Sequence, residues 1–401
     1  MTNSHKLIIY LPVLVILTVG CGLFGSDDPD FPFKATVVSA VEVVFELSAK
    51  PGDEITIEQG EQQIQSFTMH SADTLVSAIN LQPSTSYVFK ALNQSTGATS
   101  KTVEATTIDT TSSNFSWQTF SFGQHSSSVL HGVSIIDENN IWAVGEIYMN
   151  DSTGQADDEI YNAAHWNGNE WSLKRITVDF RGNRITLPLE GVKAFSNTDI
   201  WLAGSLPIHG DGEKWDIYDV RTTVDSGLSL WEIWGSETNK IYAGGKNGSL
   251  AYWNGQTWQK IETNTDLDFY DIYGTEKEGV IAVAAKLFVN FDKTIVRIKD
   301  NQSVEELSTK GIPYPIHGLW IDEQGVSYVV GSGIYRKPDI NSLVSWQAIH
   351  QDITNNYIQA IDANALNDVM VVGAFGEKLH FNGARWNSFN QNISGNLYDV
   401  A

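Results

Sequence analysis

Oxygen-rich side chains gather in one segment that could hold a metal ion. The stretch from residue 150 to residue 159 carries carboxylates at Asp151, Asp157, Asp158 and Glu159. Hard oxygen ligands of this kind are what calcium binds in proteins. The segment lacks a recognised calcium-loop pattern, so we favour a solvated loop. The four carboxylates remain candidate ligand-binding positions, with calcium as the candidate ion.

Other catalytic patterns are absent from the sequence. The nine histidines show no spacing typical of a metal site. Neither a nucleophile-elbow nor a phosphate-loop pattern occurs. Carboxylates are plentiful, but spacing alone cannot select a pair at the separation that glycoside hydrolysis needs. We therefore expect no catalytic residues, no metal site and no cofactor other than the candidate calcium ion, and we favour a non-catalytic protein.

The charge balance excludes nucleic acid as a partner. The 401-residue chain has 48 acidic and 25 basic residues, a formal net charge of −23, and no cluster of Lys or Arg. Such a surface repels polyanions. The hydrophobic fraction of 42% and the 13 tryptophans supply enough apolar surface for folded cores. The length predicts about two or three domains.

The N-terminus carries an export signal. Lys6 precedes an apolar run over residues 7–19, which is too short for a membrane span but fits the core of a signal peptide. Gly20 and Cys21, the only cysteine, follow it. This stretch resembles a bacterial lipobox, although Thr18 stands where that motif usually has leucine. The resemblance implies a signal peptide over 1–20 and lipidation of Cys21.

Lipidation of Cys21 predicts the localisation of the protein. An acyl chain contributes about 0.8 kcal/mol per buried methylene, so more than one chain anchors a protein stably. We expect a lipid-anchored protein of the cell envelope, on the periplasmic or surface face of the outer membrane. Residues 21–30 form an acidic tether. An ordinary secreted protein with a coincidental cysteine is the alternative.

Residues 31–109 read as a small β-sandwich. Short alternating strands such as 54–58 are separated by turns such as 51–54. The stretch Leu81 to Phe89 resembles the leucine-x-proline-x-threonine-x-tyrosine motif of fibronectin type III domains. The resemblance implies that Tyr87 makes a structural corner contact with upstream backbone. The tryptophan that many such domains carry is missing. Residues 110–116 read as a linker.

An internal repeat defines the rest of the chain. An apolar residue is followed twelve positions later by a glycine that ends an apolar run. The offset recurs five times, and a sixth unit has Ala284 in place of the glycine. The pairs are Val133 and Gly145, Val192 and Gly204, Ile233 and Gly245, Ile272 and Ala284, Leu319 and Gly331, and Ile361 and Gly373. We name the first member of each pair the aligned residue.

The second half of each unit predicts a hairpin. Asn-Gly between apolar strands occurs at 167–168, 254–255 and 382–383, and this pair is the strongest short hairpin signal. Each unit then has four strands in about 40 residues, as a propeller blade does. The tryptophans at equivalent outer-strand positions favour a structural role between blades over stacking on sugars. They are Trp171, Trp258, Trp346 and Trp386.

The repeat anatomy over 117–401 resembles bacterial β-propellers of the sialidase and photosystem-assembly-factor type. We therefore expect an all-β protein, with a small fibronectin-like sandwich followed by a six- to seven-bladed propeller whose last blade is incomplete. Residues 397–401 begin a seventh unit, with Val400 in the aligned position, and residues 116–120 read as an orphan outer strand. A six-bladed ring with loose end strands is the alternative.

The resemblance to sialidases does not extend to their catalytic residues. Only seven arginines exist, and none lies in the setting that a sialidase requires. We therefore favour a non-catalytic binding or scaffold protein with a protein or glycan ligand. A glycan hydrolase or lyase is the first alternative, and a membrane-protein assembly factor, by analogy of fold, is the second.

Overall fold

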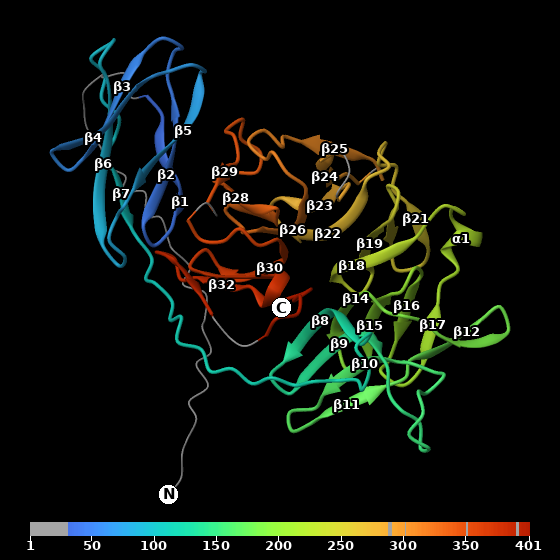
Figure 1. Ribbon diagram of the computed structural model, residues 1–401. Helices are drawn as coiled ribbons and strands as arrows, with labels where there is room; N and C mark the ends of the chain where they lie inside the picture. The colour runs from blue at the N-terminus through green and yellow to red at the C-terminus, as the bar shows by residue number, and fades with distance from the viewer. Residues whose placement is uncertain (1–30, 288–290, 301, 350–351, 390–392) are drawn as a thin grey trace, which may run out of the picture.

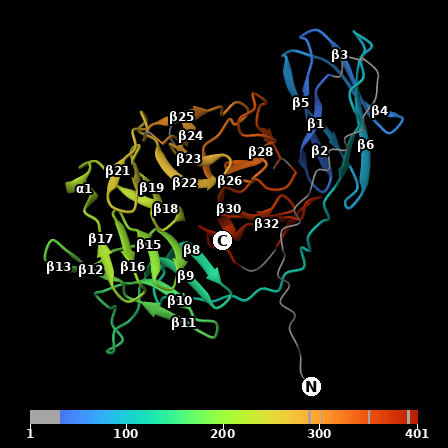
Figure 2. The same cartoon turned by 180° about the vertical axis from the view of Figure 1, so that it is seen from behind.

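The structure is a computed structural model that describes residues 31–287, 291–300, 302–349, 352–389 and 393–401. The predicted signal peptide, Cys21 and the tether lie outside the described residues. Two parts built almost wholly of strands stand side by side (Figures 1 and 2). The expectation of an all-β fold is confirmed. Within the described ranges, no helix has the length and apolar content to cross a membrane.

The first part is a sandwich of a three-stranded and a four-stranded sheet. Phe45 lies at its centre, with ring centroids 4.6 Å from Phe33 and 4.8 Å from Phe89. The Tyr87 hydroxyl accepts a hydrogen bond from the backbone N–H of Gln82 at 2.8 Å. The strands are β1 (Phe33–Val38), β2 (Glu42–Ser48) and β5 (Asp73–Ile79) in one sheet, and β3 (Glu54–Gln59), β4 (Gln62–Thr68), β6 (Ser86–Asn93) and β7 (Val103–Thr106) in the other.

The second part is a ring of six four-stranded antiparallel sheets, which we call blades 1 to 6. Each blade runs outward in chain order from an inner strand, and every inner strand carries one aligned residue. Blade 1 consists of β8 (Val129–Asp137), β9 (Asn140–Ile147), β10 (Tyr161–Trp166) and β11 (Trp171–Lys174), and blade 2 of β14 (Gly191–Ser196), β15 (Asp199–Ala203), β16 (Pro207–Gly210) and β17 (Trp215–Ile217). Blade 3 consists of β18 (Leu230–Glu237), β19 (Lys240–Gly245), β20 (Leu250–Trp253) and β21 (Trp258–Lys260), and blade 4 of β22 (Asp268–Thr275), β23 (Gly279–Ala285), β24 (Lys293–Ile298) and β25 (Val304–Leu307). Blade 5 consists of β26 (Ile316–Ile321), β27 (Ser327–Gly331), β28 (Gly333–Lys337) and β29 (Gln347–Ala348), and blade 6 of β30 (Ile358–Ala365), β31 (Asp368–Gly373), β32 (Lys378–Phe381) and β33 (Trp386–Ser388).

The recurring glycine has a steric cause. A Cβ atom at Gly145 would lie 2.1 Å from the carbonyl oxygen of Val129, and one at Gly245 would lie 1.8 Å from that of Ser229. Both carbonyls belong to residues where the inner strand begins. The second strand therefore passes so close to the inner strand that a side chain does not fit, which is the usual reason for glycine within a strand.

Neighbouring blades pack face to face through their inner strands. In blade 5, Leu319 and Ile321 pack in one apolar cluster with Ile281 and Val283 of blade 4, and Ile321 is only 1% exposed. Blade 2 repeats this contact with blade 1, through Val192 and Ala194. The aligned residue and the residue two positions later thus face the preceding blade.

The position between blade 6 and blade 1, which we call the seventh sector, differs from the others. Residues 397–400 lie at its inner side, where the Asp399 carboxylate accepts a hydrogen bond from the backbone N–H of Val133 at 2.7 Å. The same bond joins Asp271 of blade 4 to Leu319 of blade 5 at 2.7 Å. Residues 397–400 therefore take the inner position of a seventh blade, as the incomplete last blade predicted.

The prediction of an outer strand over residues 116–120 is wrong, because these residues form no strand, although they cross the outer side of the seventh sector. Phe115 contacts Phe389 of blade 6 at 5.5 Å, and Phe120 contacts Trp171 of blade 1 at 5.9 Å. An additional hairpin, β12 (Thr177–Phe180) and β13 (Asn183–Thr186), and the single-turn helix α1 (Val220–Thr223) project from blades 1 and 2.

The sandwich is fixed to the ring. Val37 and Val44 belong to the same apolar cluster as Trp320 of blade 5 and Leu379 of blade 6. Beside it, Arg336 donates to Glu42 at 2.8 Å, with side chains only 15% and 14% exposed.

Because the Glu42–Arg336 pair is largely buried, Glu42→Ala should lower the free energy of unfolding by about 2–4 kcal/mol. The cause is the guanidinium left without its anion. Thermal and urea unfolding measure the change. The double variant Glu42→Ala/Arg336→Met should recover most of the loss, because it leaves no buried charge. If Glu42→Ala were as stable as the parent, the result would contradict a contribution of this ion pair to stability.

Candidate functional site

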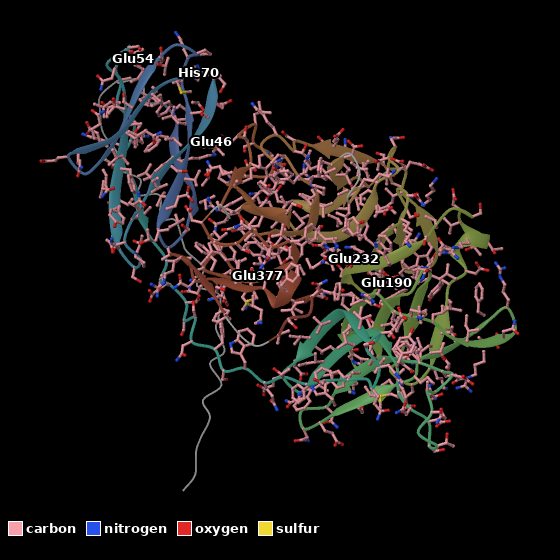
Figure 3. The ribbon with its side chains drawn as sticks, viewed as in Figure 1. Glu46, Glu54, His70, Glu190, Glu232 and Glu377 are labelled. Carbon is pink, nitrogen blue, oxygen red and sulfur yellow. The ribbon has the colours of Figure 1, made fainter. Side chains whose placement is uncertain are left out.

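The inner strands enclose a central cavity of about 1440 Å³. It is larger than the roughly 300–1,000 Å³ of a drug-sized pocket. Nine carboxylates and two lysines line it, and no arginine occurs among its described lining residues. The carboxylates are Glu190, Glu232, Glu237, Asp271, Glu276, Asp300, Glu323, Asp362 and Asp399. Figure 3 shows Glu190 and Glu232 facing the centre of the ring from neighbouring blades.

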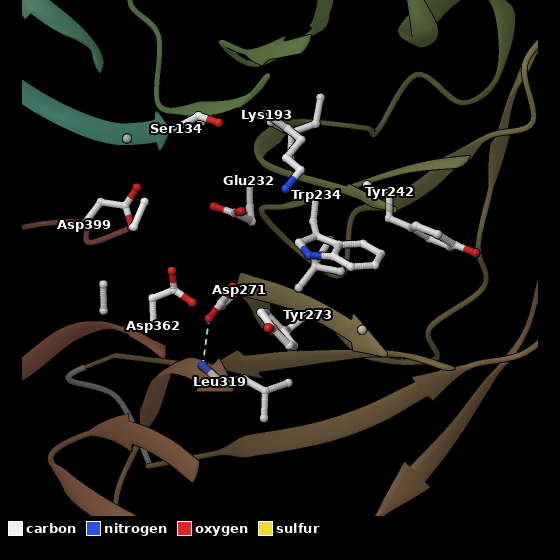
Figure 4. Close-up of a pocket in the computed structure, with 18 of the residues that line it drawn as sticks. Ser134, Lys193, Glu232, Trp234, Tyr242, Asp271, Tyr273, Leu319, Asp362 and Asp399 are labelled. Atoms are coloured by element: carbon white, nitrogen blue, oxygen red, sulfur yellow. Dashed lines mark hydrogen bonds between the residues drawn. The ribbon is translucent and has the colours of Figure 1, made fainter. Parts of the chain in front are cut away.

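Four of these carboxylates converge on the axis because of the repeat. Glu232, Asp271 and Asp399 each come directly before an aligned residue, and Asp362 comes directly after one. Their carboxylates point toward one another across the cavity (Figure 4). Equal register in different blades means equal depth along the axis, so Glu232, Asp271 and Asp399 lie at one level and Asp362, at the register of Lys193, lies at the next. We call the four carboxylates together the carboxylate belt.

Burial raises the pKa of the belt carboxyls. Removal from water raises the pKa of Glu232 well above its usual range, and the neighbouring Asp271 and Asp399 raise it further. The pKa of Asp271 is also raised by burial, against the lowering effect of the Leu319 N–H. Burial among protein atoms raises the pKa of Asp399 to about 7, although water in the cavity still reaches this residue.

One ammonium group faces the belt. Burial lowers the pKa of Lys193, and the nearby Asp362 opposes that shift. The same lysine raises the fraction of Asp362 that is ionised, although burial still raises the pKa of this carboxyl overall. One cation against four carboxyls leaves the belt with unbalanced negative charge whenever the carboxyls ionise.

Aromatic side chains lie on both sides of the belt along the axis. On one side Trp231 stacks on Tyr270 at 5.7 Å, and Tyr270 stacks on His317 at 4.5 Å. These three residues all lie two positions before an aligned residue. Burial lowers the pKa of His317 to about 4, so this ring is neutral at pH 7. On the other side, Trp234 and Tyr273 lie 6.3 Å apart (Figure 4).

The four carboxylates that the sequence predicted as ligand-binding positions lie outside the central cavity. The Asp151 carboxylate accepts hydrogen bonds from Thr153 and Gln155 within its own turn. Asp157 pairs with Arg175 at 2.7 Å, and Glu159 lies 3.7 Å from the same guanidinium. Asp158 is exposed. Within the described residues, no group of three or more His, Cys, Asp or Glu side chains is placed to hold a metal ion. Ligand binding by this loop stays a prediction.

The outer-strand tryptophans fall into two pairs. Trp258 and Trp346 are 6% and 3% exposed, and each lies in a cluster that joins two blades. Trp171 contacts Phe120 and Phe122 of the crossing segment, and Trp386 contacts Phe381 of its own blade. None of the four lines the cavity.

A serine, a histidine and an aspartate also meet at blade 6. Ser113 Oγ lies 2.8 Å from His380 Nδ1, and His380 Nε2 lies 2.8 Å from Asp368. The same pairing with a second-strand residue recurs for His209 and Asp199 in blade 2, where no serine among the described residues contacts the histidine. His380 is fully buried. We therefore assign this group a structural role.

Similarity to known proteins is limited to the fold. No protein-family model and no curated protein matches the chain. A solved structure described as YCF48 bound to D1 peptide has a TM-score of 0.51 at 14% identity, over 68% of this chain and 86% of that chain. The larger part of the chain is a β-propeller. YCF48 from Cyanidioschyzon merolae gives a TM-score of 0.50 at 13% identity, over 68% and 88% of the two chains.

A third propeller-type structure is less similar. It is a catalytically inactive virginiamycin B lyase from Staphylococcus aureus with quinupristin, at a TM-score of 0.44 and 12% identity. The alignment covers 85% of this chain and 97% of that chain. At 13–14% identity the two likenesses to YCF48 show the fold alone and leave the function open.

The raised pKa of Asp271 gives a stability prediction for the propeller. An acid with a folded-state pKa above its unfolded value destabilises the protein as pH rises from about 4 to about 7. Asp271→Asn keeps an acceptor for the Leu319 N–H and cannot ionise. The free energy of unfolding of the variant should be about 1 kcal/mol higher than that of the parent at pH 8, and the two should be equal at pH 4. Urea unfolding across this range measures the difference.

The matched control is Asp158→Asn, at an exposed position outside the cavity. It should change stability by less than about 0.5 kcal/mol at every pH. A stability gain for Asp271→Asn that is independent of pH would contradict the ionisation argument.

Proposed function

We propose that this protein is a non-catalytic binding module of the cell envelope whose propeller cavity takes a positively charged segment of a partner polypeptide. The carboxylate belt carries the proposal. The belt carries more negative charge than Lys193 alone can balance. A lysine or arginine side chain that enters the cavity would neutralise part of this charge. The aromatic rings beside the belt suit the same ligand, because ammonium and guanidinium groups bind ring faces.

A polypeptide suits the cavity better than a compact small molecule. Aromatic groups lie on both sides of the belt along the axis, so an extended chain can contact all three layers at once. The peptide in the YCF48 structure supports this choice by analogy of fold. The sandwich, which is fixed to blades 5 and 6, would hold the propeller at a set distance from an anchor on Cys21.

Lysine-containing peptides test the proposal directly. The probe is an acetylated pentapeptide with lysine at alternate positions, and its control carries glutamate at those positions. We expect the lysine peptide to bind and to change tryptophan fluorescence, since Trp231 and Trp234 line the cavity. Asp271→Asn should weaken binding about tenfold, equivalent to about 1.4 kcal/mol. Equal binding of both peptides, or of neither, would overturn the proposal.

Binding should also release protons. Carboxyls with raised pKa hold protons near neutral pH, and a bound cation favours their ionised form. We therefore expect affinity for the lysine peptide to rise from pH 6 to pH 8. Calorimetry in buffers of different ionisation enthalpy counts the protons released. Affinity that stays constant over this range would exclude the belt as the site of contact.

The anchor is tested separately. Cys21→Ala should move the protein from the membrane fraction to the soluble fraction, because an unmodified chain loses its acyl groups. Protein that remains in the membrane fraction would contradict lipid anchoring and leave the cavity proposal intact.

A glycan hydrolase is the second candidate, because neighbouring carboxyls with raised pKa can include a general acid. It requires one protonated and one ionised carboxyl on either side of a glycosidic bond. Turnover of any arrayed glycan that Asp271→Asn abolishes would favour this candidate over a binding module.

A further inference from the structure

Blade 4 lacks an aromatic ring that the other five blades carry at the same place. In those five blades, the outermost strand begins with a tryptophan or directly follows one. In blade 4, the outermost strand begins with Val304, which pairs with Ile298 of the third strand. The five tryptophans are Trp171, Trp215, Trp258, Trp346 and Trp386. The junction between blade 4 and blade 3 therefore differs from its equivalents.

Elsewhere this tryptophan covers an aromatic residue in the second strand of the preceding blade. Trp215 of blade 2 lies 6.0 Å from Trp142 of blade 1, with the ring planes at 73°. Trp258 of blade 3 lies 5.8 Å from Trp201 of blade 2, with the ring planes at 75°. Trp142 is 3% exposed and Trp201 is 1% exposed. At both junctions the edge of an indole thus seals an aromatic floor.

The floor at the junction of blades 3 and 4 is left open. Tyr242 has the register of the covered residues, because it pairs with Trp234, the residue directly after the aligned residue. Although Tyr242 packs in one cluster with Val304, it is only partly buried and lines the central cavity. At the next two junctions, the equivalent residues Ile281 and Tyr328 are 0% and 2% exposed.

Three aromatic rings form this floor, and we call the space above them the blade 3–4 groove. Tyr252 lies 4.8 Å from Tyr242, and Trp234 lies 6.2 Å from the same ring (Figure 4). All three line the cavity, and they come from three successive strands of blade 3. Glycine faces them from blade 4, where a Cβ atom at Gly274 would lie 2.9 Å from the Trp234 indole. The groove therefore runs outward from the carboxylate belt.

Charged groups surround the groove. Glu237, Lys240 and Asp300 line the cavity beside it, and Lys240 is paired with Glu237 at 3.0 Å. Burial, with Tyr252 and Asp300 nearby, raises the pKa of Tyr242 to about 12, so this ring is neutral at pH 7. The groove thus combines neutral ring faces with an excess of negative charge. A ligand with a basic group beside an aromatic ring matches both features.

We propose that the blade 3–4 groove binds an aromatic side chain of the same partner polypeptide whose cationic residue enters the carboxylate belt. The inference rests on the proposed function, since the groove opens into the same cavity. Equivalent floors at the two preceding junctions hold an indole of this chain, so an indole of the partner is the ring that fits. Edge-to-face packing of aromatic rings would add to the burial of apolar surface.

Peptides with a tryptophan test the proposal. The lysine pentapeptide described above is extended by one tryptophan at its N-terminal or its C-terminal end, and each version has a match with alanine. We expect one tryptophan peptide to bind the full chain at least about tenfold more tightly than its alanine match in calorimetry. If tryptophan gives no gain at either end while the lysine peptide binds, the groove is overturned and the proposed function stands.

Variants locate the added affinity. Val304→Trp supplies the missing ring, so it should bind the tryptophan and alanine peptides equally, with the alanine peptide bound as by the parent. Val304→Leu is the matched control without a ring, and it should keep the preference for tryptophan. Tyr242→Leu removes part of the floor without adding volume, and it should lose the preference. A preference that both Val304→Trp and Tyr242→Leu retain would contradict the assignment to this groove.

N-acetyltryptophanamide separates the groove from the belt, because it carries no cation. We expect saturation-transfer signals from this probe with the parent and with Val304→Leu, and none with Val304→Trp. This result together with no binding of the lysine peptide would overturn the belt as a cation site and support the groove. Equal signals with all three proteins would overturn the groove. A disaccharide that displaces the probe more strongly than the tryptophan peptides do would overturn the choice of a polypeptide.

Discussion

Face-to-face burial between successive blades is the constraint on which the rest of this structure depends. In blades 2 and 5 the inner strand presents its aligned residue and the residue two positions later to the preceding blade. Strand alternation then directs the intervening residues to the opposite side and toward the axis. A single register, repeated around the ring, therefore separates the apolar residues that pack one blade on the next from the polar residues that face the cavity.

The carboxylate belt is a result of that separation. Where the position before the aligned residue approaches a neighbouring backbone closely, glycine occupies it: a Cβ atom at Gly191 would lie 2.7 Å from the carbonyl oxygen of Trp231. Where there is room, as at Asp271, a carboxylate occupies the same register. Its bond to the next blade at Leu319 stabilises the ring, while its burial beside other carboxyls disfavours its ionised form. Blade closure and cavity chemistry thus use the same side chain.

The repeat could be predicted from the sequence because its signals are local. The twelve-residue offset reflects one tight contact within a hairpin, and Asn-Gly pairs mark turns directly. The carboxylate belt could not be found in this way, since Glu232 and Asp399 are distant in sequence and meet only when the ring closes. A comparison of the residues directly before and after the aligned residues would have shown that carboxylates recur at these positions. The β12–β13 hairpin has Arg181 and Gly182 at its turn, a pair with a weaker turn signal.

The contact between the sandwich and blades 5 and 6 has a mechanical consequence. Apolar packing around Val44 and the Glu42–Arg336 pair join the two parts at one place, and Asn367 donates to the backbone of Asp109 at 2.8 Å at another. Two separate attachments resist rotation about a single pivot. The sandwich and the ring would therefore tumble in solution with one rotational correlation time, and pulling on the sandwich would turn the whole ring with it.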